Sequence, residues 1–356
     1  MIMARQNSEK MTSGNIRWIP GLATATFIGA AGAAAPAAGM VINPIFDSSI
    51  TSLANALTIE EAFITVANDY ASSFNSNITV NIGVSWGSVA GQALPSSAVG
   101  ASVDPLYGYY SYNQVRTYLT NNAKLNPANL TLATAVKNLP VNAPSGSSLY
   151  AIPSAEAKAL GIIAGTATGK DGYVGFAGPT SSFSFNATGP IAAGTYDFGA
   201  VAAHEIDEVL GHISGIYNAT PTYRTPLDLF RYTSPGVLNF SYSTPAYFSI
   251  DGGKTKLAAF NNASTGDRAD WQTTSSTTDI QDAFIGTGSR KNLTAADLAG
   301  LDALGYGGSN SGNVSTISPT VVAFYLQLPL GVPEPAGLAV LGIGLLGTAM
   351  AARRRI

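Results

Sequence analysis

The segment HEIDEVLGH, residues 204–212, contains both histidines of this 356-residue chain. Its residue types favour divalent-metal chemistry, because an imidazole and a carboxylate four residues apart lie on the same side of a helix. His204 and Glu208 have this spacing, and on a helix they lie about 40° apart and one turn from each other. They are therefore the first two candidate metal ligands.

Glu205, the next residue, is the candidate general base. On a helix it lies about 100° around the axis from His204, close enough to reach a water on the same ion without binding that ion. The middle glutamate of a HExxH zinc-protease helix has this role. The alternative is an ordinary helix on which His204 and Glu208 make a surface contact.

His212 is a candidate for a further ligand. On a continuous helix it lies about 12 Å along the axis from His204, so one ion reaches both only if the chain breaks at Gly211. Asp267 and Asp270, in the polar loop NNASTGDRADW, are candidate Ca²⁺ ligands, although two aspartates without a further ligand series are more often plain loop residues.

A helix over residues 197–213 is expected to position the histidine segment, with Asp197 as its N-cap. Its apolar residues fall on one arc, which predicts that the ligands lie on the face away from the core. Other helices are expected over 53–74, 111–122, 130–138, 154–160 and 293–306, the last with Thr294 as N-cap and Gly305 as its stop. Strands are expected over 78–86, 172–178, 181–186 and 245–253, the second and third as a hairpin. This order of elements predicts an α+β domain over residues 40–306.

The composition limits the function. Charged residues make up 11 %, the net charge is −3 and no basic patch is present, which argues against nucleic-acid binding. The chain has no cysteine, so neither disulfides nor thiolate ligands contribute.

Both ends of the chain indicate export. Residues 1–39 combine a basic lead with the run GLATATFIGAAGAAAP, as in a signal peptide; the alternative is an N-terminal anchor. Residues 307–331 are expected to be a flexible linker. Residues 336–352 carry no charge and precede three arginines, which predicts a helix of about 25 Å that crosses the membrane with the body of the protein outside.

The tail VPEPAGLAVLGIGLLGTAMAARRRI, residues 332–356, resembles the PEP-CTERM sorting signal of exopolysaccharide-producing Gram-negative bacteria. This resemblance implies an exosortase-type sorting enzyme as a partner, cleavage near Pro333-Glu334-Pro335, and delivery to the cell surface or extracellular matrix.

The strings AAHEIDEVLG, LDLFRYTSPG, YFSIDGGKTKLAAFNN, GDRADW and LTAADLAGLDALGY resemble a family of secreted bacterial proteins classed as zinc metalloproteases and related to the matrixin-like metzincins. The resemblance implies a Zn²⁺ cofactor and a metzincin-like mixed sheet over an active-site helix, closed by an irregular C-terminal subdomain. The chain departs from the metzincin helix HExxHxxGxxH at Glu208 and Ser214, and it has no methionine between residues 213 and 306. A carboxylate ligand lowers the charge of the site and acidifies its water less than an imidazole does.

Asp228 lies in the stretch that resembles the family best and is the preferred candidate for the third ligand. Its alternative is a structural salt bridge with Arg224 or Arg231. Arg231 and Tyr232 are candidate donors to a developing oxyanion.

These observations predict an exported zinc-dependent endopeptidase in which His204 and Glu208, with Asp228 or His212, bind the metal and Glu205 activates water for attack on a peptide bond. The alternative is a non-catalytic surface or matrix protein that uses a degenerate protease fold for adhesion or scaffolding.

Overall fold

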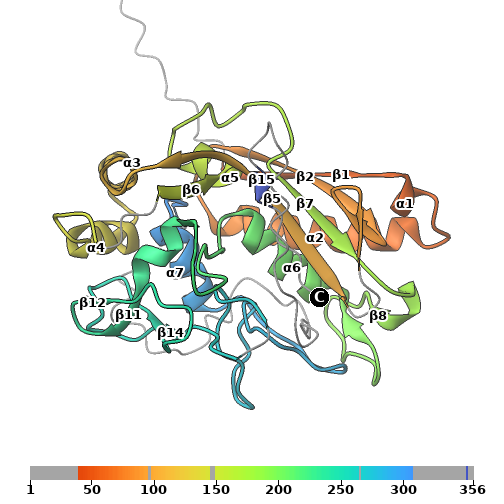
Figure 1. Ribbon diagram of the computed structural model, residues 1–356. Helices are drawn as coiled ribbons and strands as arrows, with labels where there is room; N and C mark the ends of the chain where they lie inside the picture. Colours follow the sequence, from red (N-terminus) through yellow and green to blue (C-terminus); the bar gives the residue numbers. More distant parts are fainter. Residues whose placement is uncertain (1–38, 95–97, 145–148, 264–265, 308–349, 352–356) are drawn as a thin grey trace, which may run out of the picture. The chain divides into compact units, whose positions relative to one another are not determined.

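A computed structural model describes residues 39–94, 98–144, 149–263, 266–307 and 350–351. It confirms the α+β class: a mixed sheet covers one side of a helical layer, and the C-terminal part of the domain covers the other (Figure 1). The expected signal peptide, linker and sorting tail lie outside the described residues, apart from Gly39, Gly307 and the pair Met350–Ala351. No helix among the described residues is long and apolar enough to cross a membrane.

The main sheet has the order β1-β2-β7-β5-β6-β10. Strands β1, β2 and β7 run parallel, whereas β5 runs antiparallel to both β7 and β6. The short β15 also pairs with β5. The bounds are β1 Val41–Phe46, β2 Thr79–Trp86, β5 Gly100–Tyr110, β6 Leu149–Pro153, β7 Gly172–Phe176, β10 Tyr223–Arg224 and β15 Met350–Ala351.

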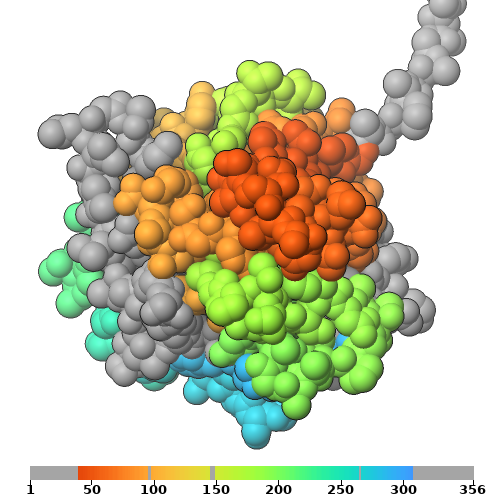
Figure 2. Space-filling model, turned by 90° about the vertical axis from the view of Figure 1, so that its right-hand side faces the viewer, coloured from red at the N-terminus to blue at the C-terminus, as the bar shows by residue number. Residues whose placement is uncertain are grey.

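The expected hairpin between residues 172–178 and 181–186 is wrong. Strand β7 pairs with β2 and β5, while β8 (Phe183–Ser184) pairs in parallel with β9 (Tyr196–Asp197), directly before the histidine helix. Gly178, at φ +87°, and the 3₁₀ turn η1 (Thr180–Ser182) lead the chain away from β7 before it can fold back. The β8–β9 region, in green, lies on one face of the domain beside the β1–α2 region, in orange and red (Figure 2).

The expected helices all form. They are α2 (Ala56–Ser73), α3 (Tyr112–Leu125), α4 (Leu130–Asn138), α5 (Ser154–Ala159), α6 (Phe198–Val209) and α7 (Ala295–Ala303), and the structure adds α1 (Ser48–Thr51). Thr294 caps α7 through its side chain, and Gly305, at φ +110°, follows the helix, as the sequence predicts.

After α6 the chain is irregular, with one small antiparallel sheet of order β12-β11-β13-β14. The short elements of the domain are β3 (Ser88–Val89), β4 (Gln92–Ala93), η2 (Pro226–Phe230), β11 (Arg231–Ser234), β12 (Val237–Leu238), β13 (Tyr247–Phe248) and β14 (Ala258–Ala259). Isolated bridges join Trp271 to Phe260 on one side and to Asp282 on the other. These bridges hold the long loops to one another.

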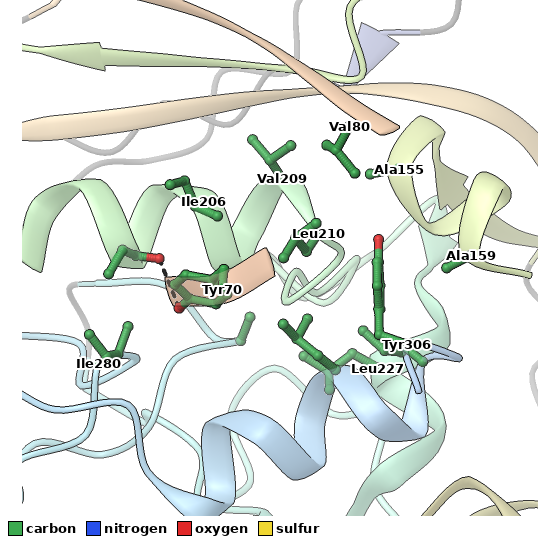
Figure 3. Close-up of a cluster of buried hydrophobic side chains, with 14 of the residues drawn as sticks. Tyr70, Val80, Ala155, Ala159, Ile206, Val209, Leu210, Leu227, Ile280 and Tyr306 are labelled. Carbon is green, nitrogen blue, oxygen red and sulfur yellow. Dashed lines mark hydrogen bonds between the residues drawn. The ribbon is translucent and has the colours of Figure 1, made fainter. Parts of the chain in front are cut away.

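Helix α6 is the centre of the domain, and all twelve of its residues are buried. Ile206, Val209 and Leu210 pack in the core with side chains from α2, β2 and the residues just after α7, and the Tyr70 hydroxyl donates to the Ala203 carbonyl at 3.0 Å (Figure 3). The expectation that the ligand face points away from the core is wrong. The loops after residue 266 cover that face as well, so both sides of the helix are packed.

Candidate metal centre

The ends of helix α6 are determined locally. Asp197 caps its start, accepting a hydrogen bond from the Gly199 amide at 2.9 Å. The helix ends at Val209, and Gly211 has a φ of +114°, a conformation that favours glycine. His204, Glu205 and Glu208 therefore lie on a continuous helix, and His212 lies beyond the break.

Three side chains converge on one point. His204, Glu208 and Asp270 each place one ligand atom so that all three atoms lie within 4.8 Å of one another. Their exposures are 1 %, 0 % and 0 %. Two buried carboxylates beside a neutral imidazole carry a formal charge of −2, which a divalent cation would neutralise, and buried charges are normally paired or bind metals. The donor set of one nitrogen and two oxygens fits Zn²⁺.

His204 is held in the orientation that a metal ligand needs. Its Nδ1 lies 2.9 Å from the Ile280 carbonyl and donates to it, which leaves the lone pair on Nε2. Gln281, the next residue, donates from Nε2 to the His204 carbonyl at 2.9 Å. The Ile280–Gln281 segment thus holds both the ring and the backbone of His204.

Strand β5 bonds Glu208 and passes close to Glu205. The Ser102 hydroxyl donates to Glu208 Oε2 at 2.7 Å. Gly100 lies two residues before Ser102, on the same face of the strand. A methyl group added at Gly100 would lie 2.7 Å from Glu205 Oε1 and 2.3 Å from Val201 Cγ1. Glycine at this position therefore allows the strand to approach Glu205 closely.

Asp270 comes from a loop whose backbone is held by hydrogen bonds over residues 267–271. Five successive carbonyls, residues 267–271, each accept a hydrogen bond. The donors are Asn261 Nδ2 to Asp267 at 2.9 Å, Arg231 Nη1 to Arg268 at 2.5 Å, His212 Nε2 to Ala269 at 3.0 Å, Asn261 N to Asp270 at 2.7 Å, and Ala283 N to Trp271 at 3.0 Å. The Trp271 indole also donates to Asp297 Oδ1 at 2.7 Å. The loop carrying Asp270 is thus preorganised.

The structure places Asp228, the preferred third ligand, away from this group. Its Oδ1 accepts from the Ser214 hydroxyl at 2.5 Å, and its Oδ2 accepts from the amides of Gly215 at 2.9 Å and Thr225 at 2.8 Å. These bonds close the loop that follows α6. The alternative expected for Asp228, a salt bridge with Arg224 or Arg231, stays a prediction: Arg224 stacks on the Phe240 ring at 3.5 Å, and the charge of Asp228 favours the charged form of the buried Arg231.

His212 also lies outside the group. The chain does break at Gly211, but the break directs the imidazole to other partners: Nδ1 lies 3.2 Å from Asp207 Oδ2, and Nε2 lies 3.0 Å from the Ala269 carbonyl. The ring packs edge-on against Trp271, with centroids 4.6 Å apart. Burial lowers the pKa of His212, but the hydrogen bond and charge of Asp207 outweigh burial and raise it overall.

The remaining candidates have structural positions. Arg231 stacks over the Phe260 ring at 4.1 Å and holds the Asp270 loop, and burial raises the pKa of the Tyr232 hydroxyl to about 12. Asp267 Oδ1 accepts from the Ala269 amide at 2.7 Å, so it caps the loop, while Asp270 joins His204 and Glu208. The two aspartates expected as a Ca²⁺ pair thus have different roles.

Sequence reasoning did not group Asp270 with His204 and Glu208. Its two signals were the naming of Asp270 as a candidate Ca²⁺ ligand and its place in GDRADW, one of the strings that carry the family resemblance. No family model, curated protein or solved structure matches the chain.

Proposed function

We propose that this protein is an exported zinc-dependent endopeptidase. The observation that carries the proposal is the convergence of His204, Glu208 and Asp270 to within ligand distance, with Glu205 on the same helix. The resemblance to secreted zinc metalloproteases supports the same reading. We propose Asp270, in place of Asp228 or His212, as the third ligand.

Zn²⁺, when bound, would polarise a peptide carbonyl and lower the pKa of water. Glu205 would accept the proton of the attacking water and return it to the leaving amine nitrogen. Two anionic ligands leave the site less positive than three imidazoles would, so more of the proton transfer depends on Glu205. A side chain at position 100 would collide with the Glu205 carboxylate, so Gly100 leaves that carboxylate room beside β5.

The end segments extend the proposal to location. A signal peptide over 1–39 and a PEP-CTERM-like tail over 332–356 would direct the enzyme to the cell surface or extracellular matrix, with an exosortase-type enzyme processing the tail. Comparing the intact mass of the surface-delivered protein with that of the full chain tests this step, since an unprocessed tail would contradict it.

Metal content and proteolysis test the activity. We expect plasma mass spectrometry to find one zinc per chain in the wild-type protein and a loss of zinc in His204→Ala and Asp270→Ala. Glu205→Gln should keep its zinc and lose peptidase activity by about 10²-fold or more. A wild-type protein that binds no zinc after reconstitution would contradict the proposal.

One observation favours a second candidate function. All four site residues are at most 1 % exposed, as in closed zinc sites whose role is structural. In this case the protein is a non-catalytic surface or matrix protein for adhesion or scaffolding, stabilised by its metal. It would contain zinc, cleave no unstructured protein substrate, and lose its fold when a chelator removes the metal.

A further inference from the structure

His212 connects the two parts of the chain that supply the metal ligands. The residue lies just past the end of α6, which carries His204 and Glu208, and its Nε2 contacts the carbonyl of Ala269, the residue before Asp270. The carbonyls of residues 267–271 accept hydrogen bonds from several parts of the chain, and His212 is the donor that comes from the turn after α6. His212 therefore links the loop that carries Asp270 to the helix that carries His204 and Glu208.

The surroundings of the ring leave it a single orientation. Asp207 lies on the Nδ1 side and the Ala269 carbonyl on the Nε2 side, while Trp271 packs against the ring. Gly300 of α7 closes the remaining side, since a Cβ there would lie 3.3 Å from Nδ1. Both nitrogens face acceptors, so the position favours a side chain that donates in both directions.

We propose that His212 is a positioning residue of the metal centre: by bonding the Ala269 carbonyl, it holds Asp270 at ligand distance from His204 and Glu208, and so sets the affinity for zinc. The inference rests on the proposed zinc site but not on peptidase activity. Removing a group that orients a metal ligand from outside the ligand set typically weakens metal binding 10- to 100-fold.

Two substitutions separate the two polar contacts of the ring, the ion pair of Nδ1 with Asp207 and the hydrogen bond of Nε2 to the Ala269 carbonyl. His212→Asn places an amide near the Nδ1 position, so it keeps a partner for Asp207 and loses the Ala269 carbonyl. His212→Gln places its amide nitrogen near the Nε2 position and keeps the donor to Ala269. Zinc affinity, measured by competition with a chromophoric chelator, should fall at least about tenfold in His212→Asn and stay within about threefold of wild type in His212→Gln.

The Co²⁺ absorption spectrum gives a second readout, because it reports ligand geometry independently of catalysis. It should change in His212→Asn and keep its wild-type form in His212→Gln. The matched control is Asn129→Ala, which removes hydrogen bonds to the Asp302 and Tyr306 carbonyls, each 3.1 Å long, without touching the Asp270 loop. This control should lower the melting temperature and leave zinc affinity unchanged.

The inference would be overturned if His212→Asn bound zinc as tightly as the wild type. It would also be overturned if the Asn129→Ala control lost as much zinc affinity as His212→Asn does. If His212→Asn does not fold, Gly300→Ala provides the test, since its methyl group displaces the ring without removing a donor. At least about threefold weaker zinc binding in that variant supports the inference, and unchanged binding overturns it.

A wild-type protein that binds no zinc refutes the proposed function itself, whereas normal wild-type binding with insensitive His212 variants refutes this inference alone.

Discussion

The hydroxyl of Ser102 donates a 2.7 Å hydrogen bond to Oε2 of Glu208, linking the middle of strand β5 to the residue that stands where a HExxH helix has its second histidine. A carboxylate ligand has two oxygens and several binding modes, so it needs an external group to orient it. Ser102 provides that group and directs one oxygen toward the strand.

Replacing Ser102 by alanine should therefore weaken zinc binding by about tenfold or more, because Glu208 loses the donor that orients it. Ser102→Thr, which keeps the hydroxyl, is the matched variant and should bind zinc more tightly than Ser102→Ala. Chelator competition measures both affinities. Indistinguishable affinities in Ser102→Ala and the wild type would show that the bond has no part in metal binding.

Gly100→Ala should impair both the fold and the chemistry. The new methyl group would lie 2.3 Å from Val201 Cγ1 and 2.7 Å from Glu205 Oε1, so the strand or the helix must move. Overpacking of this kind costs about 1–3 kcal/mol in the free energy of unfolding. Peptidase activity should fall further than zinc occupancy does, because Glu205 is displaced. Gly286→Ala, whose added methyl group would lie 3.5 Å from Ser289 Oγ, serves as the control and should behave as wild type.

Asp228→Asn should lower stability without removing zinc. The carboxylate accepts three hydrogen bonds that close the loop after α6, and an amide can replace only part of that acceptor capacity. We expect a loss of about 1–3 kcal/mol in the free energy of unfolding, measured by urea denaturation. Zinc stoichiometry by mass spectrometry should remain at the wild-type value. Loss of the metal from a folded Asp228→Asn protein would return Asp228 to the ligand set.

Glu156→Gln should change how stability depends on pH. Glu156 on α5 is fully buried, and burial raises its pKa well above the usual value of 4.5. The folded protein then keeps a proton that the unfolded chain releases above pH 4.5, so this group stabilises the fold at low pH and the contribution declines as pH rises toward the folded pKa. Glutamine cannot ionise, so the variant should lose less stability than wild type between pH 5 and pH 8 in urea denaturation. Parallel pH profiles for the two proteins would contradict the prediction.

Local sequence signals were sufficient for the helices. The Asp197 cap and the apolar periodicity predict the start and extent of most of α6, and Thr294 and Gly305 bound α7, because caps and helical periodicity act within a few residues. The expected end of α6 at residue 213 was wrong: the helix ends at Val209, before the positive-φ Gly211. The spacing of His204, Glu205 and Glu208 follows from the helix alone. These features were open to prediction because they depend only on residues that are neighbours in the chain.

Strand β5 was missed because Gly100, Asp104, Pro105 and Gly108 interrupt its pattern, although its backbone packs directly against α6. The hairpin after β7 failed because strand pairing depends on which distant strands are available.

The sequence by itself determined the helix that carries His204, Glu205 and Glu208 and the spacing of these side chains on it, since helix geometry is local. Only the tertiary structure decided that Asp270, rather than Asp228 or His212, lies within ligand distance of His204 and Glu208, because the position of a side chain on a long loop depends on how that loop packs and where its backbone hydrogen bonds find partners.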